Sequence, residues 1–368
     1  MRGWVGKGIR RLAAEAREFH RWEALKEAGD IRVYYGMDSL PSREKPISGG
    51  IVKCLDLAER FPNSPDKANL LYLVSSALPE RRELLARAAQ RAGGRVVLNQ
   101  NGVAYPAWAG PDWKSQNAPN AHVHEMADVV VYQSEFCRRC AERFLGPQKG
   151  PGEVLYNPVD TKVFVPRQES DGKTGSPVLL VAGSHHDGYR VQVAIDALAR
   201  VRDNGVKVRL RVAGRLVWSR GAEAEARRWV REAGVEEAVE FVGPYSQRDA
   251  PALFQNAHAL IHVKVQDPCP RLVVEAMACG LPVVYSSTGG VPELVGNEAG
   301  VGIPGKEDFE VMHSPSAEAV AEAIRNLLAN REILAQQARA RSVRMFSAKN
   351  WVEAHARIFQ AVVKCGGT

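Results

Sequence analysis

The sequence has no long apolar run. None of its uninterrupted hydrophobic stretches approaches the roughly 18 residues that a membrane-spanning helix needs, which excludes a helical integral membrane protein. The opening stretch, MRGWVGKGIRRLAAEAREF, also lacks the apolar core of a secretory signal peptide. We therefore expect a cytoplasmic protein, with a peripheral position on the inner membrane face as an open alternative.

Cysteine is sparse and scattered. The chain has six cysteines, at positions 54, 137, 140, 269, 279 and 365, and FCRRC contains the one C-x-x-C. A structural zinc ion would need a second ligand pair at suitable spacing, and a thioredoxin-like motif would need its own fold context. Both are missing, so structural thiols are favoured and we expect no metal site.

The charge is basic but not concentrated. A net charge of +7 and a pI near 9.1 favour anionic partners such as nucleotide phosphates or lipid headgroups. Basic residues alternate with acidic ones and form no aromatic-basic motif, so nucleic acid is not an expected partner. Residues 7–28 read as an amphipathic helix whose polar faces mix both signs of charge. This mixture favours packing on the N-terminal domain over binding to a membrane surface.

Short apolar strands alternate with helical stretches along the whole chain. A first series comprises IRVYYG, LLYLVS, RVVLNQ, VVVYQS and EVLYNP, and a second comprises PVLLVAG, VRLRVAG, VEFVG, ALIHV and PVVYS. This alternation predicts right-handed crossovers and parallel sheets covered on both faces. The expected fold class is therefore α/β, with two facing Rossmann-like doubly wound domains and a ligand-binding cleft between them.

A polar segment divides the two series. VPRQESDGKTGSP is rich in glycine, serine and charged residues, which is typical of a linker. We predict an N-terminal domain over 1–165, a linker over 166–176 and a C-terminal domain over 177–345. The remaining residues, 346–368, read as an amphipathic helix that could cap either domain, and packing back on the N-terminal domain is one arrangement.

The stretch with the clearest signals for where helices begin and end is DPCPRLVVEAMACGLPVVYSSTGGVPELVG, residues 267–296. Pro270 suits a first helical position, Gly280 a left-handed cap, and Pro282 prevents continuation, which together predict a helix over about 270–279. PVVYS then reads as a strand buried on both faces, and VPELV as the start of another helix.

Two carboxylates flank this helix start. Asp267 falls in the loop before it and Glu275 in its second turn, while the amides near Arg271 and Leu272 point out of the same end. A helix N-terminus attracts phosphate and a nearby carboxylate accepts hydrogen bonds from sugar hydroxyls, so the combination suggests a phosphorylated sugar ligand. The alternative is a solvated helix glutamate and a turn aspartate.

Several linked motifs resemble the group 1 glycosyltransferases, retaining enzymes of the GT-B fold that form family 4. SGGIVKCLDLAERF is similar to the family's N-terminal Gly-Gly loop and helix, and ADVVVYQSEFCRRC to its strand ending in Ser-x-Phe. VLYNPVDTKVFVP resembles the segment before the linker. DPCPRLVVEAMACGLPVVYSSTGGVPEL resembles the segment in which two acids are separated by seven residues.

The resemblance implies a role for each matching position. Glu275 would bind the ribose hydroxyls, Asp267 would bind a hydroxyl of the donor sugar, and backbone near Pro270, Arg271 and Leu272 would help hold the sugar or phosphate. The base-facing loop would contribute Gly243, Tyr245 and Ser246. The N-terminal glycine pair is Gly49 and Gly50, and the first loop of the C-terminal domain contains Gly183 and Ser184. Only glycine lets a backbone approach a diphosphate that closely.

The phosphate-binding loop departs from the family pattern. The family's arginine and lysine are replaced by Ser184 and Tyr189 in VAGSHHDGYRVQVAIDAL. Arg190 is the expected substitute, with Arg215 and Arg271 as alternatives, since an arginine at a helix N-terminus binds phosphate well. His185 and His186 are further candidate donors, although adjacent histidines on a loop more often face solvent.

The sugar-binding positions depart as well. Asp267 shortens the first acid of the pair by one methylene. Asn101, in NQNGVAYP, is the closest match to the family's N-terminal histidine. An asparagine can hydrogen-bond a hydroxyl but cannot carry a proton.

The implied function is hexosyl transfer from a nucleotide diphosphate sugar to a glycan or lipid-linked acceptor in cell-surface polysaccharide or glycolipid synthesis. In the family the leaving phosphate is thought to deprotonate the acceptor, so no carboxylate nucleophile, cofactor or metal is expected. Two alternatives stay open, namely a nucleotide-sugar epimerase and a nucleotide-sugar binding protein without transfer activity.

Overall fold

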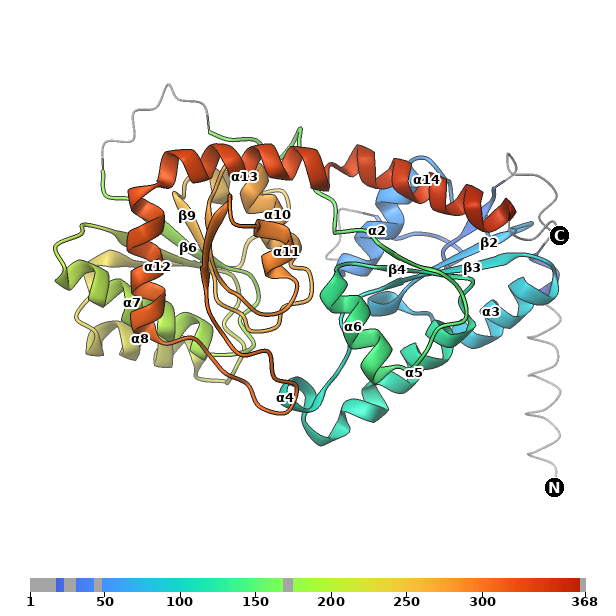
Figure 1. Cartoon of the computed structure of the whole chain (residues 1–368), viewed down its shortest axis with the longest axis horizontal. Helices are drawn as coiled ribbons and strands as arrows, with labels where there is room; N and C mark the ends of the chain where they lie inside the picture. The colour runs from blue at the N-terminus through green and yellow to red at the C-terminus, as the bar shows by residue number, and fades with distance from the viewer. Residues whose placement is uncertain (1–17, 23–30, 43–47, 168–174, 365–368) are drawn as a thin grey trace. The chain divides into compact units, whose positions relative to one another are not determined.

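The computed structural model describes residues 18–22, 31–42, 48–167 and 175–364 (Figure 1). Its chain divides into two compact units: Met1–Leu155 with Lys349–Thr368 forms the N-terminal unit, and Tyr156–Ala348 forms the C-terminal unit. The helix expected over 7–28 lies outside the described residues except for 18–22. No helix in the described ranges is long and apolar enough to cross a membrane.

The N-terminal unit contains a five-stranded parallel sheet in the order β1-β2-β3-β4-β5. Its strands are β1 Val33–Tyr34, β2 Leu70–Val74, β3 Arg95–Gln100, β4 Val129–Tyr132 and β5 Gly152–Val154. Its helices are α2 Gly49–Ala58, α3 Arg82–Arg91, α4 Pro106–Ala109, α5 Trp113–Met126, α6 Glu135–Phe144 and α14 Ala348–Lys364. All five strands predicted before residue 165 are therefore confirmed.

Alternation along β2 buries both faces of this sheet. Leu70, Tyr72 and Val74 pack with α2 and with Trp351 and Phe359 of α14 in one apolar cluster. Figure 1 shows α2 and α14 over this face, and α3, α5 and α6 over the other. The C-terminal helix therefore contributes to the core of the N-terminal unit.

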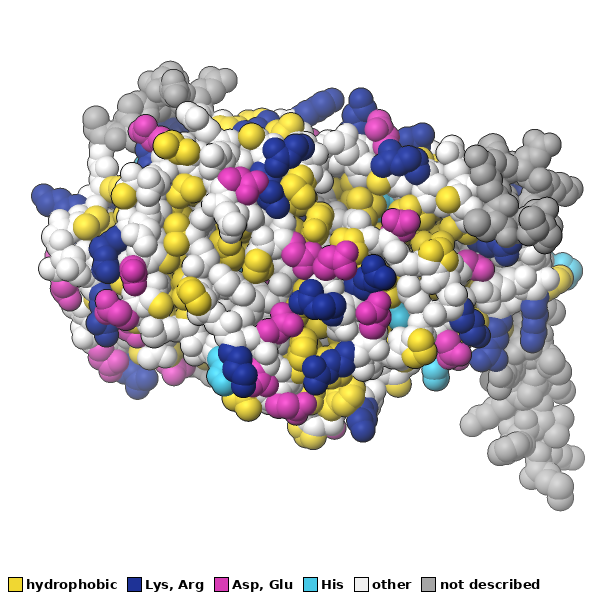
Figure 2. Space-filling model, in the orientation of Figure 1, with side chains coloured by type: hydrophobic (Ala, Val, Ile, Leu, Met, Phe, Trp, Pro, Cys, Tyr) yellow, Lys and Arg dark blue, Asp and Glu magenta, His cyan; other side chains and the backbone are white. Residues whose placement is uncertain are grey.

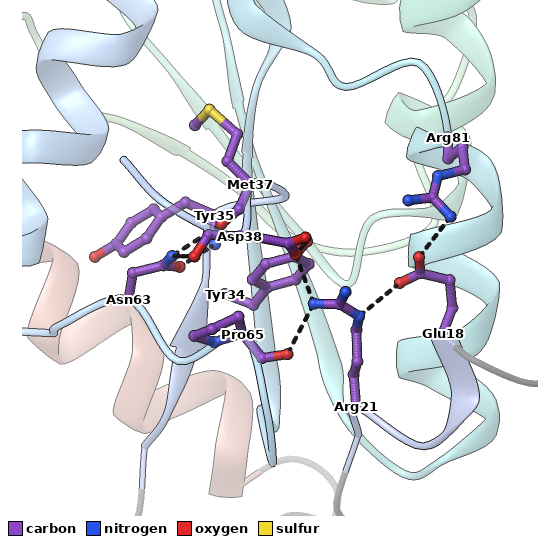
Figure 3. Close-up of polar contacts among 9 residues, drawn as sticks. All are labelled: Glu18, Arg21, Tyr34, Tyr35, Met37, Asp38, Asn63, Pro65 and Arg81. Carbon is purple, nitrogen blue, oxygen red and sulfur yellow. Dashed lines mark hydrogen bonds and ion pairs between the residues drawn. The ribbon is translucent and has the colours of Figure 1, made fainter. Parts of the chain in front are cut away.

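An ion-pair network holds residues 18–22 against the N-terminal unit (Figure 3). Arg21 donates to Asp38 Oδ1 at 2.6 Å and to the Pro65 carbonyl at 3.2 Å. Glu18 is buried and pairs with Arg21 at 3.4 Å and with Arg81 at 2.8 Å. Removing one partner of a buried pair costs far more than removing an exposed one, so Glu18 fixes this segment more firmly than the exposed Asp38 does.

The C-terminal unit contains a six-stranded parallel sheet in the order β11-β10-β9-β6-β7-β8. Its strands are β6 Val178–Ala182, β7 Arg209–Ala213, β8 Val239–Gly243, β9 Ala259–His262, β10 Val283–Ser286 and β11 Gly300–Ile303. Its helices are α7 Tyr189–Asp203, α8 Ala222–Glu232, α9 Ala250–Gln255, α10 Arg271–Ala278, α11 Val291–Val295, α12 Ala317–Ala329 and α13 Arg331–Phe346. The five strands predicted here are confirmed, and β11 is additional.

The strands of this sheet also alternate between two apolar layers. Leu179 and Val181 of β6 join the cluster formed with α7, α8 and α12, whereas Leu180 and Ala182 join the cluster with α9, α10, α11 and α13. Figure 1 shows α7, α8 and α12 on one side of β6 and β9, with α10 and α11 on the other. The unit is therefore doubly wound, as the sequence predicted.

The strand order reverses between β6 and β9. From β6 the chain first builds outward through β7 and β8, and then returns to place β9 on the other side of β6. Ligands of doubly wound sheets bind at the carboxyl ends of the strands at such a switch point. The loops that follow β6 and β9 therefore lie side by side where a ligand is expected.

The division between the units differs from the predicted linker. The sequence placed a linker at 166–176, whereas the C-terminal unit begins at Tyr156. Val159 and Phe164 are buried in its core, and Arg339 donates to the carbonyls of Phe164 and Thr161. Apolar burial and these hydrogen bonds attach the segment before the polar stretch to the C-terminal unit.

Candidate active site

Asp267 lies at the carboxyl end of β9, in the loop before α10. Its side chain is buried, and its Oδ2 atom is 3.1 Å from His262 Nε2 and 3.4 Å from Lys264 Nζ. Burial raises the pKa of Asp267, but Lys264, the His262 hydrogen bond and the Arg190 charge together hold it well below its usual value. The side chain is therefore an anion at neutral pH.

His262 is the neutral partner of that anion. Burial lowers its pKa, against the raising effect of Asp267. Because an ionised carboxylate only accepts hydrogen bonds, His262 Nε2 must carry the ring proton and donate a hydrogen bond to Asp267. His262 Nδ1 is then an acceptor, buried and without a hydrogen-bond partner among the described residues. The hydrogen bond from His262 fixes the orientation of the Asp267 carboxylate.

Glu275 lies in the second turn of α10, as predicted. Its side chain is buried, and Oε1 accepts from Gln247 Nε2 at 2.8 Å and pairs with Arg271 Nε at 3.3 Å. The helix begins at Arg271 and not at Pro270, because Pro270 keeps the extended backbone of an N-cap residue, with φ −69° and ψ 118°. These two contacts hold Oε1 and so orient the carboxylate.

Arg190 and Tyr245 belong to the same group of side chains. Arg190 is buried in the first turn of α7 and donates from Nη1 to the Ser184 carbonyl at 3.3 Å. Burial raises the pKa of Tyr245 to about 12, with Glu275 raising it and Arg190 lowering it. Arg190 also lowers the pKa of Asp267. The structure thus brings together Arg190, Tyr245, Asp267 and Glu275, which the sequence predicted as site residues.

Three glycines allow the loops after β6, β7 and β8 to meet. Gly183, Gly214 and Gly243 have φ values of +111°, +109° and +77°. A Cβ at Gly214 would lie 1.9 Å from the Gly183 carbonyl oxygen, and the Gly214 amide donates to the Gly243 carbonyl. A Cβ at Gly183 would lie 3.8 Å from Leu272. Gly183, Gly243 and Leu272 therefore line one edge of the sheet.

The remaining predicted positions of this edge are exposed or partly exposed. Ser184 is exposed, and its backbone carbonyl accepts the hydrogen bond from Arg190. Ser246 is exposed, and its hydroxyl donates to Asp249 Oδ2 at 2.5 Å before α9. Arg271 is partly buried through its contact with Glu275. These residues flank the buried group.

The interpretation of His185 was wrong. The sequence suggested a solvent-facing or phosphate-binding histidine, but His185 is fully buried and its Nε2 donates to the Ala213 carbonyl at 3.1 Å. Burial lowers its pKa to about 4. Its backbone also pairs with Arg215 and Val217, so His185 joins two loops, whereas His186 is exposed.

Two further residues of this edge were not predicted. Gln266 has φ +52°, and its Oε1 accepts from the Asp308 amide at 2.7 Å, which ties a second loop beside Asp267. Asn157 is buried and donates to the Cys269 carbonyl at 2.7 Å. Asn157 stands in the VLYNPVD motif, which was a usable signal, whereas no pattern in the sequence marked Gln266.

A second set of predicted residues lies in the N-terminal unit. Asn101 follows β3, and its Nδ2 donates to Ser76 Oγ at 2.5 Å. A Cβ at Gly50 would lie 2.7 Å from the same Ser76 oxygen, so Gly50 is required by packing. A Cβ at Gly49 would meet no atom within 4 Å, so packing does not require a glycine at this position. Lys53 of α2, which was not predicted, contacts Asn101 Oδ1 at 3.3 Å.

The described residues include five of the cysteines, all of them buried. These five cysteines, Cys54, Cys137, Cys140, Cys269 and Cys279, form no disulfide bond with one another. No group of three or more potential metal-ligating side chains occurs among the described residues. Burial raises the pKa of the Cys54 and Cys279 thiols to about 12, so neither is a reactive thiolate.

Residues 166–342 match the model of the family described as "Glycosyl transferases group 1". The chain is 26% identical over 251 residues to a glycogen synthase of Mycobacterium tuberculosis, covering 65% of this chain and 56% of that protein. It is 25% identical over 264 residues to a GDP-mannose-dependent alpha-(1-6)-phosphatidylinositol dimannoside mannosyltransferase of the same organism, covering 68% and 62%. The chain thus spans little more than half the length of these relatives.

Solved glycosyltransferase structures share the fold. Anabaena HepE in complex with UDP aligns with a TM-score of 0.65 at 19% identity, covering 84% of this chain and 81% of that one. Sucrose-phosphate synthase from Thermosynechococcus elongatus aligns with a TM-score of 0.64 at 17% identity, covering 86% and 77%. The fold is therefore that of the GT-B glycosyltransferases, and residues 166–342 are similar to the group 1 glycosyltransferase family model.

Proposed function

We propose that the protein is a retaining glycosyltransferase of family 4 that transfers a hexosyl group from a nucleotide diphosphate sugar. The observation that carries the proposal is the pair of buried carboxylates around the start of α10, Asp267 and Glu275, grouped with Arg190 at the switch point of a doubly wound sheet. A cation beside anionic hydrogen-bond acceptors suits a ligand that carries both phosphate and sugar hydroxyls.

The donor would occupy the carboxyl edge of β6, β8 and β9. Glu275 would accept from the ribose hydroxyls, and Asp267 would accept from a hydroxyl of the sugar. The amides at the start of α10 and the guanidinium of Arg190 would face the diphosphate. Tyr245 and the backbone after Gly243 would face the base.

The reaction breaks the bond between the anomeric carbon and the diphosphate oxygen, and forms a new bond to the acceptor hydroxyl on the same face. Negative charge develops on the leaving phosphate, where Arg190 and the α10 amides would stabilise it. The leaving phosphate would take the acceptor proton, so the chemistry requires no carboxylate nucleophile. Neither a metal nor an organic cofactor enters the proposal.

The acceptor is proposed to be a glycan or a lipid-linked sugar. Asn101, Gly49 and Gly50 are the proposed ligand-binding residues of the N-terminal unit. The named activity of the mannosyltransferase relative, with GDP-mannose and a phosphatidylinositol dimannoside, supports this kind of donor and acceptor. A lipid-linked acceptor would bring the basic chain to the inner membrane face in cell-surface polysaccharide or glycolipid synthesis.

The test is nucleotide binding by the full chain and by Glu275→Ala. We expect UDP, GDP or ADP to raise the melting temperature of the wild-type protein, and Glu275→Ala to weaken that nucleotide about tenfold or more, because a charge-assisted ribose contact is lost. Calorimetric titration measures the dissociation constant. Glu318→Ala is the matched control, since Glu318 is an exposed glutamate paired with Arg200 in the same unit.

Unchanged nucleotide affinity in Glu275→Ala would contradict the donor-site assignment.

A second candidate, binding without transfer, is favoured by one observation. Tyr189, at the position where the family places a lysine, uses its hydroxyl to accept the Val265 amide at 3.0 Å. Product analysis with the stabilising nucleotide's sugar conjugates separates the two, since a binding protein would give saturation without a glycosylated product.

A further inference from the structure

His262 is the polar residue at the end of an otherwise apolar strand. Ala259, Leu260 and Ile261 of β9 are buried in the apolar layers of the C-terminal unit, and His262 is 2% exposed beside them. Its Nδ1 atom has no hydrogen-bond partner among the described residues. Leaving a buried polar atom unpaired is costly, and an apolar residue at this position would avoid that cost. The reason for a histidine here therefore lies in its other ring nitrogen, Nε2.

His262 Nε2 holds one oxygen of the Asp267 carboxylate. It lies 3.1 Å from Asp267 Oδ2, and Lys264 Nζ lies 3.4 Å from the same atom. No described residue donates a hydrogen bond to Oδ1, and the Asp267 side chain keeps 11% of its surface exposed. One oxygen is therefore held by the protein, and the other remains an acceptor for a ligand.

The backbone at Asp267 is constrained as well. Gln266 has φ +52°, in the left-handed region that residues other than glycine rarely adopt. Its amide donates to Thr288 Oγ1 at 3.0 Å, and the Asp267 carbonyl accepts from the Gly290 amide at 2.9 Å. A Cβ at Gly289 would lie 2.7 Å from that carbonyl oxygen. Strained backbone persists only where surrounding contacts hold it, and it gathers at functional sites.

We propose that His262 is a positioning residue for recognition of the donor sugar, because its hold on Oδ2 directs Oδ1 of Asp267 towards a hydroxyl of the hexosyl group. This rests on the proposed function, in which Asp267 accepts from that sugar. An ionised carboxylate only accepts hydrogen bonds, so the site favours a sugar with a free hydroxyl at this place. His262 does not touch the ligand, and its effect passes through Asp267.

The test measures what the sugar adds to nucleotide binding. Calorimetric titration of the full chain uses UDP, GDP and ADP, and their conjugates UDP-glucose, GDP-mannose and ADP-glucose. We define the sugar ratio as the dissociation constant of a nucleotide divided by that of its conjugate, which isolates the hexosyl group. We expect His262→Leu to lower this ratio about tenfold and to leave the affinity for the nucleotide within about twofold.

Asp267→Asn shows whether His262 acts through the carboxylate. Asparagine keeps the size of the side chain but removes the ionised acceptor, so the sugar ratio should fall as it does in His262→Leu. Adding His262→Leu to Asp267→Asn should then cause no further loss, since the two residues act as one unit. A second tenfold loss in the double variant would overturn the proposal.

His262→Gln separates positioning from packing. The terminal amide of glutamine places an N–H donor near the place of Nε2, whereas the shorter His262→Asn places its amide near that of Nδ1. Glutamine should keep most of the sugar ratio, and asparagine should lose it as leucine does. His262→Asn also carries the test if His262→Leu does not fold. His20→Leu is the control, because His20 is exposed in the other unit.

The outcomes separate this proposal from the proposed function. Nucleotide binding that depends on Glu275, with a sugar ratio unchanged in His262→Leu and His262→Asn, would overturn the role of His262 and keep the donor site. Equal losses in His262→Gln and His262→Leu would also overturn it, because packing alone would then explain both. Failure of every nucleotide and conjugate to bind the wild type would remove the donor site and this role together.

Discussion

Asp267 and Glu275 have different surroundings although one sequence motif contains both. Asp267 is paired with Lys264 and hydrogen-bonded by a neutral His262, whereas Glu275 contacts Gln247 and Arg271. The motif predicts where the two carboxylates stand along the chain. It carries no information about His262 or Gln247, because these partners arrive from other elements of the fold.

Buried neutral histidines predict a loss of stability in acid. Burial lowers the pKa of His355 to about 3, and those of His124 and His185 to about 4. Below about pH 6.5, the pKa of a histidine in the unfolded chain, these histidines bind protons in the unfolded chain but stay neutral in the folded one. Their contribution to stability is therefore complete above about pH 6.5 and is lost as the pH falls towards 4. Urea unfolding between pH 7 and pH 5 should show this decline.

His355→Gln isolates one of these groups, because glutamine retains a hydrogen-bonding amide for Tyr72 but does not titrate. Replacing the histidine should flatten the pH dependence of the unfolding free energy of the N-terminal unit by up to about 1.4 kcal/mol per pH unit between pH 6 and 5. His20→Gln, at an exposed position of the same unit, should keep the wild-type slope. An unaltered slope in His355→Gln would show that His355 is not the titrating group.

At the scale of elements, the contact between the loops after β6 and β7 predicts one strongly destabilising substitution. Gly214→Ala combines a φ of +109° with a Cβ placed 1.9 Å from the Gly183 carbonyl oxygen. Backbone strain and overpacking together should lower the unfolding free energy of the C-terminal unit by about 3 kcal/mol or more. Chemical denaturation measures the change.

Gly221→Ala is the matched control for this substitution. Gly221 has a φ of −102° before α8, and a Cβ there would meet no atom within 4 Å. Its replacement should change stability by less than about 1 kcal/mol. Similar effects of the two substitutions would mean that Gly214 is not held against Gly183.

Most elements were predictable because their patterns are local. The strand at 178–182 is apolar throughout and flanked by turn residues, and the helix over 271–278 is bounded by Pro270 and Gly280. The strand Gly300–Ile303 was missed because GVGI contains two glycines, which ordinarily disfavour a strand. The close approach of β10 requires a glycine here, since a Cβ at Gly300 would lie 2.1 Å from the Val283 carbonyl oxygen.

At the scale of the whole molecule, the chain enters the C-terminal unit at Tyr156 and returns to the N-terminal unit at Lys349. Truncation after Ala348 should therefore destabilise the N-terminal unit alone. It removes Trp351 and Phe359, two nearly fully buried aromatic residues, each worth about 3–5 kcal/mol in a core. Hydrogen-exchange mass spectrometry should show lost protection in β2 and retained protection in β6.

Phe359→Leu is the milder companion to the truncation, since it keeps the helix but loses the edge-to-face contact with Tyr72 at 5.8 Å. It should weaken protection in β2 by a smaller amount than the truncation does. Full protection of β2 in the truncated chain would contradict the placement of α14 in this core.

The distribution of charge over the surface also belongs to this scale. Figure 2 shows basic and acidic side chains interspersed over the face in view. The interleaving of signs that was read along the sequence is therefore also present on this surface. A net charge of +7 spread in this way favours small anionic ligands over an extended polyanion.

The sequence by itself determined the alternation of strands and helices, the two parallel α/β units and the places of Asp267 and Glu275 around a helix start, because periodicity, turn residues and spacing act over a few neighbouring residues. Arg190 was added by the resemblance to the group 1 glycosyltransferases. Only the tertiary structure decided that His185 is buried, that Gln247 orients Glu275, that α14 completes the N-terminal core and that Lys53 meets Asn99 and Asn101. These contacts join residues distant in the chain, and burial and hydrogen bonding between them are properties of the packed molecule.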